Sequence, residues 1–239
     1  FEGIKTNVIG SQNVIDACLE ENVERVIGIG TDKAVSPLNT YGATKALMEK
    51  LFVAAGNYSN PNKHRTKFIT IRYGNVLGSS GSVIPVFAKQ IKSNQKITIT
   101  DPQMTRLSTT MKGALDFIVK AAEIGKGSEI FVPKLRAYSI TDVKDVLQEL
   151  LGNTGEEIIG IRHGEKLHEI LINQDEIRYS WELDNLYMIS NPIFDDEVIK
   201  SKYPGIKHLE KLGEYSSDKV EKISKEELKI LIYELGIKK

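Results

Sequence analysis

The chain has 239 residues, of which 41% are hydrophobic, and its 32 basic and 32 acidic side chains give a formal net charge of zero. This length and hydrophobic content allow one large or two small domains, while the balanced charge gives no sign of nucleic acid binding or of a polybasic membrane surface. No apolar run approaches the roughly 20 residues that a membrane span needs. The single cysteine, Cys18, leaves no internal disulfide, so the composition predicts a protein of the reducing cytoplasm.

Hydrophobic patterning predicts helices that alternate with short apolar strands. Residues 1–20 are expected to form a helix with an apolar stripe, supplied by Val8, Ile9, Val14, Ile15 and Leu19. Apolar runs predict strands at 25–30, 67–73, 97–99 and 130–132. Further helices are expected at about 40–57, after Pro85 (with Val86, Phe87 and Ile91 as its apolar residues), at 110–124 and at 140–151. A polar loop is expected at 60–64, and a last helix is expected to follow its cap, Ser224.

This alternation predicts an α/β fold in which helices cover both faces of a parallel sheet. Beyond residue 155 the pattern becomes shorter and mixed, which is typical of a smaller second lobe. We therefore expect residues 1–155 to form the sheet domain and residues 156–239 to form mainly a second lobe that ends in the last helix, with the two parts interleaved.

Tyr41 and Lys45 are the residues that best indicate a chemistry. Four apart in a predicted helix, they project from one face and lie one turn from each other. In that arrangement an ammonium stabilises the phenolate that a general base needs. Such pairs also occur by chance, and on spacing alone a half-buried tyrosine near a solvated lysine is an equally good interpretation. Here, however, the pair follows the apolar strand at 25–30 and the tripeptide Thr31-Asp32-Lys33.

Thr31-Asp32-Lys33 followed by Tyr41-Gly42-Ala43-Thr44-Lys45 resembles the active site of extended short-chain dehydrogenase/reductases that act on nucleotide sugars. The Asp-Lys pair resembles one branch in particular, the inverting UDP-N-acetylglucosamine 4,6-dehydratases of the polysaccharide biosynthesis protein family. Further stretches carry the same resemblance over nearly the whole chain: Tyr73-Gly74-Asn75-Val76, Gly81-Ser82-Val83-Ile84-Pro85, Asp101-Pro102-Gln103-Met104-Thr105-Arg106 and Ile161-Arg162-His163-Gly164-Glu165-Lys166-Leu167-His168-Glu169.

The resemblance implies a Rossmann-like, doubly wound parallel sheet with a smaller substrate-binding lobe at the C-terminal end. It also implies a nicotinamide cofactor, NADP, with NAD left open because the deciding residue follows a strand outside this sequence. The sequence contains no G-x-G-x-x-G phosphate cradle and begins in a helix. Measured against the family, we expect the chain to lack the N-terminal third, which would leave the strand at 25–30 as an exposed edge.

Individual roles also follow from the resemblance. The implied catalytic residues are Thr31, Asp32, Lys33, Tyr41 and Lys45. The implied cofactor-binding residues are Asn7, Tyr41, Lys45, Tyr73, Gly74, Asn75 and Val76. The implied substrate-binding residues are Asn75, Ser82, Val83, Arg106, Arg162 and Glu165, with both arginines toward the diphosphate of a UDP-sugar. No metal is expected, since His163 and His168 have no convincing third ligand nearby and favour polar or packing roles.

The implied reaction is oxidation of the sugar at C4, loss of water across C5 and C6, and return of hydride to C6 with C5 inverted. Tyr41 would be the base at C4, Lys33 the base at C5 and Asp32 the acid at C6. Two alternatives stay open: a related UDP-sugar epimerase or dehydratase/epimerase, and a non-catalytic fragment that binds nucleotide sugars. A full-length enzyme of this kind is expected to form a homo-oligomer.

Overall fold

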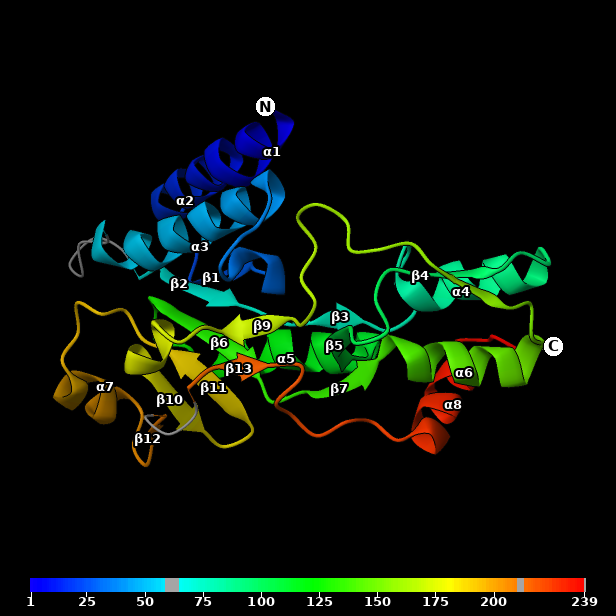
Figure 1. The fold of residues 1–239 in the computed structure, drawn as a ribbon. Helices are drawn as coiled ribbons and strands as arrows, with labels where there is room; N and C mark the ends of the chain where they lie inside the picture. Colours follow the sequence, from blue (N-terminus) through cyan, green and yellow to red (C-terminus); the bar gives the residue numbers. More distant parts are fainter. Residues whose placement is uncertain (59–64, 210–212, 239) are drawn as a thin grey trace. The chain divides into compact units, whose positions relative to one another are not determined.

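The computed structural model describes residues 1–58, 65–209 and 213–238 (Figure 1). The loop predicted at 60–64 lies outside these residues. The described chain divides into two compact units, and each draws on segments from both halves of the sequence. Unit 1 comprises Phe1–Tyr73, Lys112–Lys134 and Ile170–Tyr215, and unit 2 comprises Gly74–Met111, Leu135–Glu169 and Ser216–Lys239. The functional assignment of 1–155 and 156–239 to two lobes stays a prediction.

Unit 1 contains a six-stranded sheet. Its strands, in spatial order, are β1 (Arg25–Ile29), β2 (Lys67–Ile71), β6 (Glu129–Pro133), β11 (Leu186–Ile189), β10 (Ser180–Leu183) and β12 (Lys207–His208). The first three strands pair in parallel, as the sequence predicts, and the other three extend the sheet in the antiparallel sense. β1 is the first strand in this order, with β2 as its neighbour.

Helices cover both faces of the parallel part. The unit 1 helices are α1 (Glu2–Ile4), η1 (Lys5–Ile9), α2 (Gly10–Glu20), η2 (Asp32–Ala34), α3 (Thr40–Tyr58), α5 (Met111–Ile124), η3 (Glu176–Tyr179) and α7 (Asp196–Lys202). Consecutive β2 residues point to opposite faces: Phe68 packs with Phe52 of α3, and Ile69 packs with Phe117 of α5. This arrangement confirms a doubly wound α/β fold.

The N-terminal helix differs from expectation in its buried face. Ile15 is buried, but Ile9 and Val14 are 52% and 48% exposed. The buried face of α2 contains Ser11 and the predicted Ile15, and both Cys18 and the predicted Leu19 pack against the same cluster. A π-helical segment, η1, also interrupts the α-helical register over Lys5–Ile9, so one continuous apolar stripe from residue 8 onward does not form.

Unit 2 has its own core, formed mainly by helices α4 (Val83–Lys92), α6 (Ile140–Leu151) and α8 (Lys225–Glu234). A three-stranded sheet contains β3 (Asn75–Val76), β5 (Thr105–Thr109) and β7 (Arg136–Ser139). The strand predicted at 97–99 exists as β4 (Ile97–Ile99), but it pairs with β8 (Glu156–Ile158) rather than joining the main sheet. Two further strands pair with each other: β9 (Ile170–Ile172), which belongs to unit 1, and β13 (Tyr215–Ser216).

Two predicted helices of unit 2 are found with small changes. α4 begins at Val83, two residues before Pro85, because proline is tolerated in the first turn, where its missing N–H has no helical partner. Phe87 and Ile91 are buried as expected, whereas Val86 is partly exposed. α8 begins after Ser224, as predicted. Among the described residues, no helix has the length and apolar character to cross a membrane.

The cap of α8 gives a direct test of this fold. The Ser224 hydroxyl accepts a hydrogen bond from the Glu227 backbone N–H at 3.2 Å. We expect Ser224→Ala to lower the free energy of unfolding by about 1 kcal/mol, because the N–H loses its partner. Urea unfolding measures this difference, with Ser80→Ala, at an exposed turn position, as the matched control. Equal stability of the two variants would contradict the capping role.

Candidate active site

The carboxyl end of β1 leads directly into the first group of candidate residues. Gly30 N–H donates to the Ile71 carbonyl at 2.7 Å, which continues the contact between β1 and β2. Thr31 then caps the short helix η2: its hydroxyl accepts from Lys33 N–H at 3.4 Å and donates to the Asp32 carboxylate at 2.8 Å. Open α/β sheets bind their ligands at this end of parallel strands.

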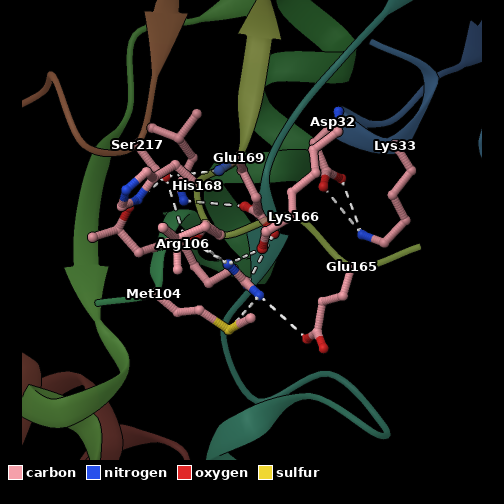
Figure 2. Close-up of polar contacts among 12 residues, drawn as sticks. Asp32, Lys33, Met104, Arg106, Glu165, Lys166, His168, Glu169 and Ser217 are labelled. Carbon is pink, nitrogen blue, oxygen red and sulfur yellow. Dashed lines mark hydrogen bonds and ion pairs between the residues drawn. The ribbon is translucent and has the colours of Figure 1, made fainter. Parts of the chain in front are cut away.

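Asp32 and Lys33 form an ion pair with very different exposure at its two ends. Lys33 Nζ lies 3.1 Å from Asp32 Oδ2 and 3.3 Å from Oδ1, as Figure 2 shows. The Asp32 side chain is 5% exposed and the Lys33 side chain 47%. A buried carboxylate is therefore held by the Thr31 hydroxyl on one side and by a half-exposed ammonium on the other. This arrangement places a proton donor and a proton acceptor within hydrogen-bond distance of each other.

The first turn of α3 is fixed against η2 by a glycine. Gly42 N–H donates to Asn39 Oδ1 at 2.8 Å. A Cβ at position 42 would lie 2.2 Å from the Lys33 carbonyl oxygen and 3.0 Å from Pro37 Cβ, so no larger residue fits without displacement. Tyr41, the residue before this contact, keeps half of its surface exposed. The close approach places the start of the tyrosine helix against the backbone that carries Lys33.

Lys45 lies one turn after Tyr41 and reaches back to the end of β1. Its ammonium donates to the Ile29 carbonyl at 2.5 Å and contacts Met48 Sδ at 3.2 Å. Burial lowers the pKa of the Lys45 ammonium, and the nearby carboxylate of Glu49 acts in the opposite direction. Tyr41 and Lys45 are therefore both anchored to the β1 end of unit 1, through Gly42 and Ile29 respectively.

Asn7 also contacts the tyrosine helix. It lies in the π-helical segment η1, and such segments are frequent at functional sites. Asn7 Nδ2 donates to Thr44 Oγ1 at 3.0 Å, and that hydroxyl donates to the Tyr41 carbonyl at 2.9 Å. The Ser11 hydroxyl in turn donates to the Asn7 carbonyl at 2.7 Å. Unit 1 thus brings Asn7 together with the helix of Tyr41, while its cofactor-binding role stays a prediction.

In unit 2, Arg106 is the centre of a buried polar cluster. Its guanidinium donates to the carbonyls of Thr105 and Leu167 at 2.9 and 3.1 Å and forms ion pairs with Glu165 at 3.3 Å and Glu169 at 3.4 Å. These contacts are drawn in Figure 2. Much of the hydrogen-bonding capacity of Arg106 is therefore used within the protein. Among the described residues, the second oxygen of Glu165 is buried without a hydrogen-bond partner.

Asn75 is held by a residue that the sequence analysis missed. The Tyr138 side chain hydrogen bonds to Asn75, and burial raises the pKa of the Tyr138 hydroxyl above its ordinary value. The sheet register places Asn75 opposite Ser108, and Tyr138 opposite Arg106. These residues share one face of the three-stranded sheet because directly paired residues point to the same side. If a strand had been predicted over Arg136–Ser139, Tyr138 could have been recognised as a residue on the same sheet as Arg106.

The other predicted residues of unit 2 lie in varied settings. A Cβ at Gly74 would lie 2.3 Å from the Leu107 carbonyl, so packing against β5 alone requires glycine there. Ser82 precedes α4, and its hydroxyl is buried without a hydrogen-bond partner in the described part of the chain. Val83 is the first residue of α4, and Val76 pairs with Thr109. Arg162 is exposed. The specific roles of all these residues stay predictions, as does that of Tyr73.

Comparison with known proteins defines the family of this chain. Residues 1–191 match the family described as polysaccharide biosynthesis protein. The chain belongs to this family, and its own fold is the Rossmann-like α/β fold described above.

Individual relatives carry two different names. The inverting UDP-N-acetylglucosamine 4,6-dehydratase of Campylobacter jejuni serotype O:2 is 47% identical over 194 residues, which cover 81% of this chain and 57% of that protein. The UDP-glucose 4-epimerase of Rickettsia felis is 39% identical over 98% of this chain and 69% of its own length. The X-ray structure of Pen from Bacillus thuringiensis superposes with a TM-score of 0.87 at 40% identity, covering 99% of this chain and 71% of Pen. This chain thus spans a little over half the length of the Campylobacter relative.

The contact between Gly42 and Lys33 gives a prediction for this site. We expect Gly42→Ala to lower the free energy of unfolding by about 1–3 kcal/mol, because the new methyl group meets the Lys33 carbonyl. Gly3→Ala is the matched control, since a Cβ there meets Thr44 atoms at ordinary distances of 3.7 and 3.9 Å. Chemical denaturation of both variants measures the difference. The close packing of α3 on η2 is refuted if Gly42→Ala is as stable as Gly3→Ala.

Proposed function

We propose that this chain carries the catalytic residues of a nucleotide-sugar 4,6-dehydratase, which converts UDP-N-acetylglucosamine to a 4-keto-6-deoxy sugar with inversion at C5. The observation that carries the proposal is the ion pair between Asp32 and Lys33 at the end of β1, next to the first turn of the Tyr41 helix. Similarity to the Campylobacter protein supports the same reaction. In our proposal the enzyme is a hydro-lyase that acts in the cytoplasm as a homo-oligomer.

The first step takes place at C4 of the sugar. Tyr41 removes the proton of the C4 hydroxyl, and Thr31 orients the oxygen. The Lys45 ammonium stabilises the tyrosine phenolate and holds the cofactor ribose. When bound, the nicotinamide cofactor supplies a hydride acceptor for C4 and a hydride donor for C6.

Tyr41 and Lys45 of unit 1 fit the nicotinamide end of such a cofactor, because a half-exposed phenol and an ammonium lie one helical turn apart. The sequence has no Gly-rich phosphate cradle, so this chain accounts for only part of the cofactor site. We propose NADP as the cofactor, with NAD as the alternative.

The second step removes water across C5 and C6. A ketone at C4 acidifies the C5 proton, which Lys33 removes in its neutral form. Asp32, in its protonated form, donates a proton to the departing C6 hydroxyl. In our proposal the reacting form of the pair is the one in which a proton of Lys33 Nζ has moved to Asp32 Oδ2, the carboxylate oxygen 3.1 Å away. C6 would then receive a hydride, and C5 would receive a solvent-exchangeable proton from the side opposite Lys33, which inverts that centre.

Unit 2 is proposed to bind the nucleotide. Arg162 is exposed and can approach a diphosphate, and the unpartnered oxygen of Glu165 can accept a hydrogen bond from a ribose hydroxyl. Asn75, Ser82 and Val83 are proposed substrate contacts. Arg106 is also proposed to lie toward the diphosphate, and its ion pair with Glu165 at 3.3 Å would hold that carboxylate for the ribose contact.

A C4 epimerase is the second candidate, favoured by the Rickettsia relatives, whose similarity extends over 98% of this chain. An epimerase uses the tyrosine, the lysine and the cofactor but needs no acid/base pair for C5 and C6. The buried carboxylate in contact with Lys33 therefore favours the dehydratase.

Two substitutions separate these functions in the full-length gene product. Lys33→Met and Asp32→Asn should each lower the rate of 6-deoxy product formation by about 10²–10⁴-fold, because each removes one proton-transfer group. Oxidation at C4, seen as transient absorbance of the reduced cofactor, should persist in both variants. NMR of the sugar product measures the loss, and Lys92→Met, at an exposed position, is the control. Interconversion of C4 epimers at the unaltered rate in both variants would favour the epimerase and contradict the proposal.

A further inference from the structure

Unit 1 contains a buried cluster of charged side chains that has no part in the reaction described above. Arg72, which follows β2, is 1% exposed, and its guanidinium donates through Nε and Nη2 to the carboxylate of Glu49 at 2.7–3.1 Å. The same guanidinium donates to Glu176 at 2.7 and 2.9 Å and to the Leu171 carbonyl at 3.0 Å. All of these residues belong to unit 1.

Glu49 connects this cluster to Lys45. The two residues are four apart on α3 and so lie on one face, one turn from each other. The Lys45 ammonium contacts the Ile29 carbonyl, and a Cβ at Gly30 would lie 2.3 Å from Glu49 Oε1. The ammonium and the carboxylate therefore lie against consecutive residues at the end of β1, and the absence of a side chain at Gly30 makes room for the carboxylate.

The charges of the cluster do not balance internally. One guanidinium faces two carboxylates, which leaves one net negative charge. Lys50 acts electrostatically on both Glu49 and Glu176, and Lys45 interacts with Glu49. Burial raises the pKa of Glu49, but the three guanidinium contacts favour its charged form. Burial likewise disfavours the charged form of Lys45, and Glu49 is the neighbour that opposes this effect.

We propose that Glu49, held in place by Arg72, is a positioning residue that keeps the Lys45 ammonium charged beside Tyr41. Partial burial disfavours the charge of Lys45, and a neutral amine would not stabilise a tyrosine phenolate, so a carboxylate fixed nearby supports the role proposed for Lys45. Arg72 fixes the carboxylate bidentately, so the negative charge stays at one place instead of following a flexible side chain. The catalytic meaning of this charge rests on the proposed function, whereas its effect on Lys45 does not.

The direct test is the titration of Lys45 in the full-length gene product, followed by NMR of ¹³C-labelled lysine side chains. The Lys45 signal is assigned by its disappearance in Lys45→Arg. Glu49→Gln should lower the Lys45 titration midpoint by about one pH unit or more, as expected on losing an opposite charge nearby. Glu49→Asp retains the charge at a greater distance and should lower the midpoint by less. Glu176→Gln removes the same charge from the far side of the cluster and should have less than half the effect of Glu49→Gln.

If Glu49→Gln does not fold, Glu49→Asp and Glu176→Asp decide the question, since both keep the buried charge. The first should lower the Lys45 midpoint and the second should leave it unchanged. A purely structural role for Glu49 predicts loss of stability without a change in the Lys45 midpoint. An unchanged midpoint in folded Glu49→Gln, or in folded Glu49→Asp where Glu49→Gln does not fold, overturns the inference.

Activity gives a second readout that depends on the proposed function. Because Lys45 must be protonated, the alkaline limb of kcat/KM against pH should move to lower pH in Glu49→Gln, by the same amount as the NMR midpoint. In Glu49→Asp the alkaline limb should lie closer to that of the unaltered protein than it does in Glu49→Gln. If the midpoint moves but the unaltered protein dehydrates no sugar, the inference about Glu49 holds and the proposed function fails.

Discussion

The candidate chemistry of unit 1 depends on one constraint: α3 is fixed against the end of β1 at two points. At its first turn, Gly42 allows the helix to approach the Lys33 carbonyl. Two turns later, Glu49 is bound by Arg72, which follows the neighbouring strand β2. Tyr41 lies next to the first of these points, and Lys45 lies between the two. Their positions relative to β1 are therefore determined by backbone contacts and a buried ion pair. Neither residue relies on a mobile loop for its placement.

Fixing α3 with a buried ion pair has an energetic cost. A buried carboxylate–guanidinium cluster contributes little net stability, because desolvation offsets much of the attraction, yet removing one partner typically costs about 3–5 kcal/mol. Unit 2 shows a parallel case in Arg106, whose guanidinium joins Glu165 and Glu169 to β5. Its neighbours Thr105, His168 and Ser217 add a chain of short hydrogen bonds at 2.8 and 2.6 Å. In both units, buried polar contacts hold segments that are distant in sequence.

Local sequence pattern was sufficient for much of the fold. The parallel strands β1 and β2, the helices α3, α5 and α6, and the Ser224 cap all have a clear period or cap signal and were predicted close to their observed bounds. The hairpin of β10 and β11 was missed although β11, Leu186–Ile189, is an apolar run of the kind that indicates a strand. Its partner β10, Ser180–Leu183, has no such run, and both strands extend the sheet in the antiparallel sense. The predicted face of the first helix was right at Ile15 and Leu19 but wrong at Ile9 and Val14, because Ser11, a polar residue, lies on the buried side.

The site could be predicted only in part. The residues Thr31 to Lys33 and the Tyr41–Lys45 pair follow from motifs, and the structure brings them to one end of β1. Arg72 and Glu176 are 104 residues apart, so no local pattern indicates their pairing. Glu49 could have been found, because its spacing of four from Lys45 places it on the same helix face. The protein partners of Arg106 could not be foreseen, since a motif says nothing about which contacts are already satisfied.

The most direct test of the dehydratase account is isotope placement during turnover. The full-length gene product is incubated with UDP-N-acetylglucosamine in deuterated water, and the sugar is followed by NMR. The account predicts a 4-keto-6-deoxy product with C5 inverted and deuterium at C5 but not at C6, because C5 receives a solvent-exchangeable proton while C6 receives the hydride removed from C4. Deuterium at C6 without C5, or an unlabelled C4 epimer as the only product, would contradict it.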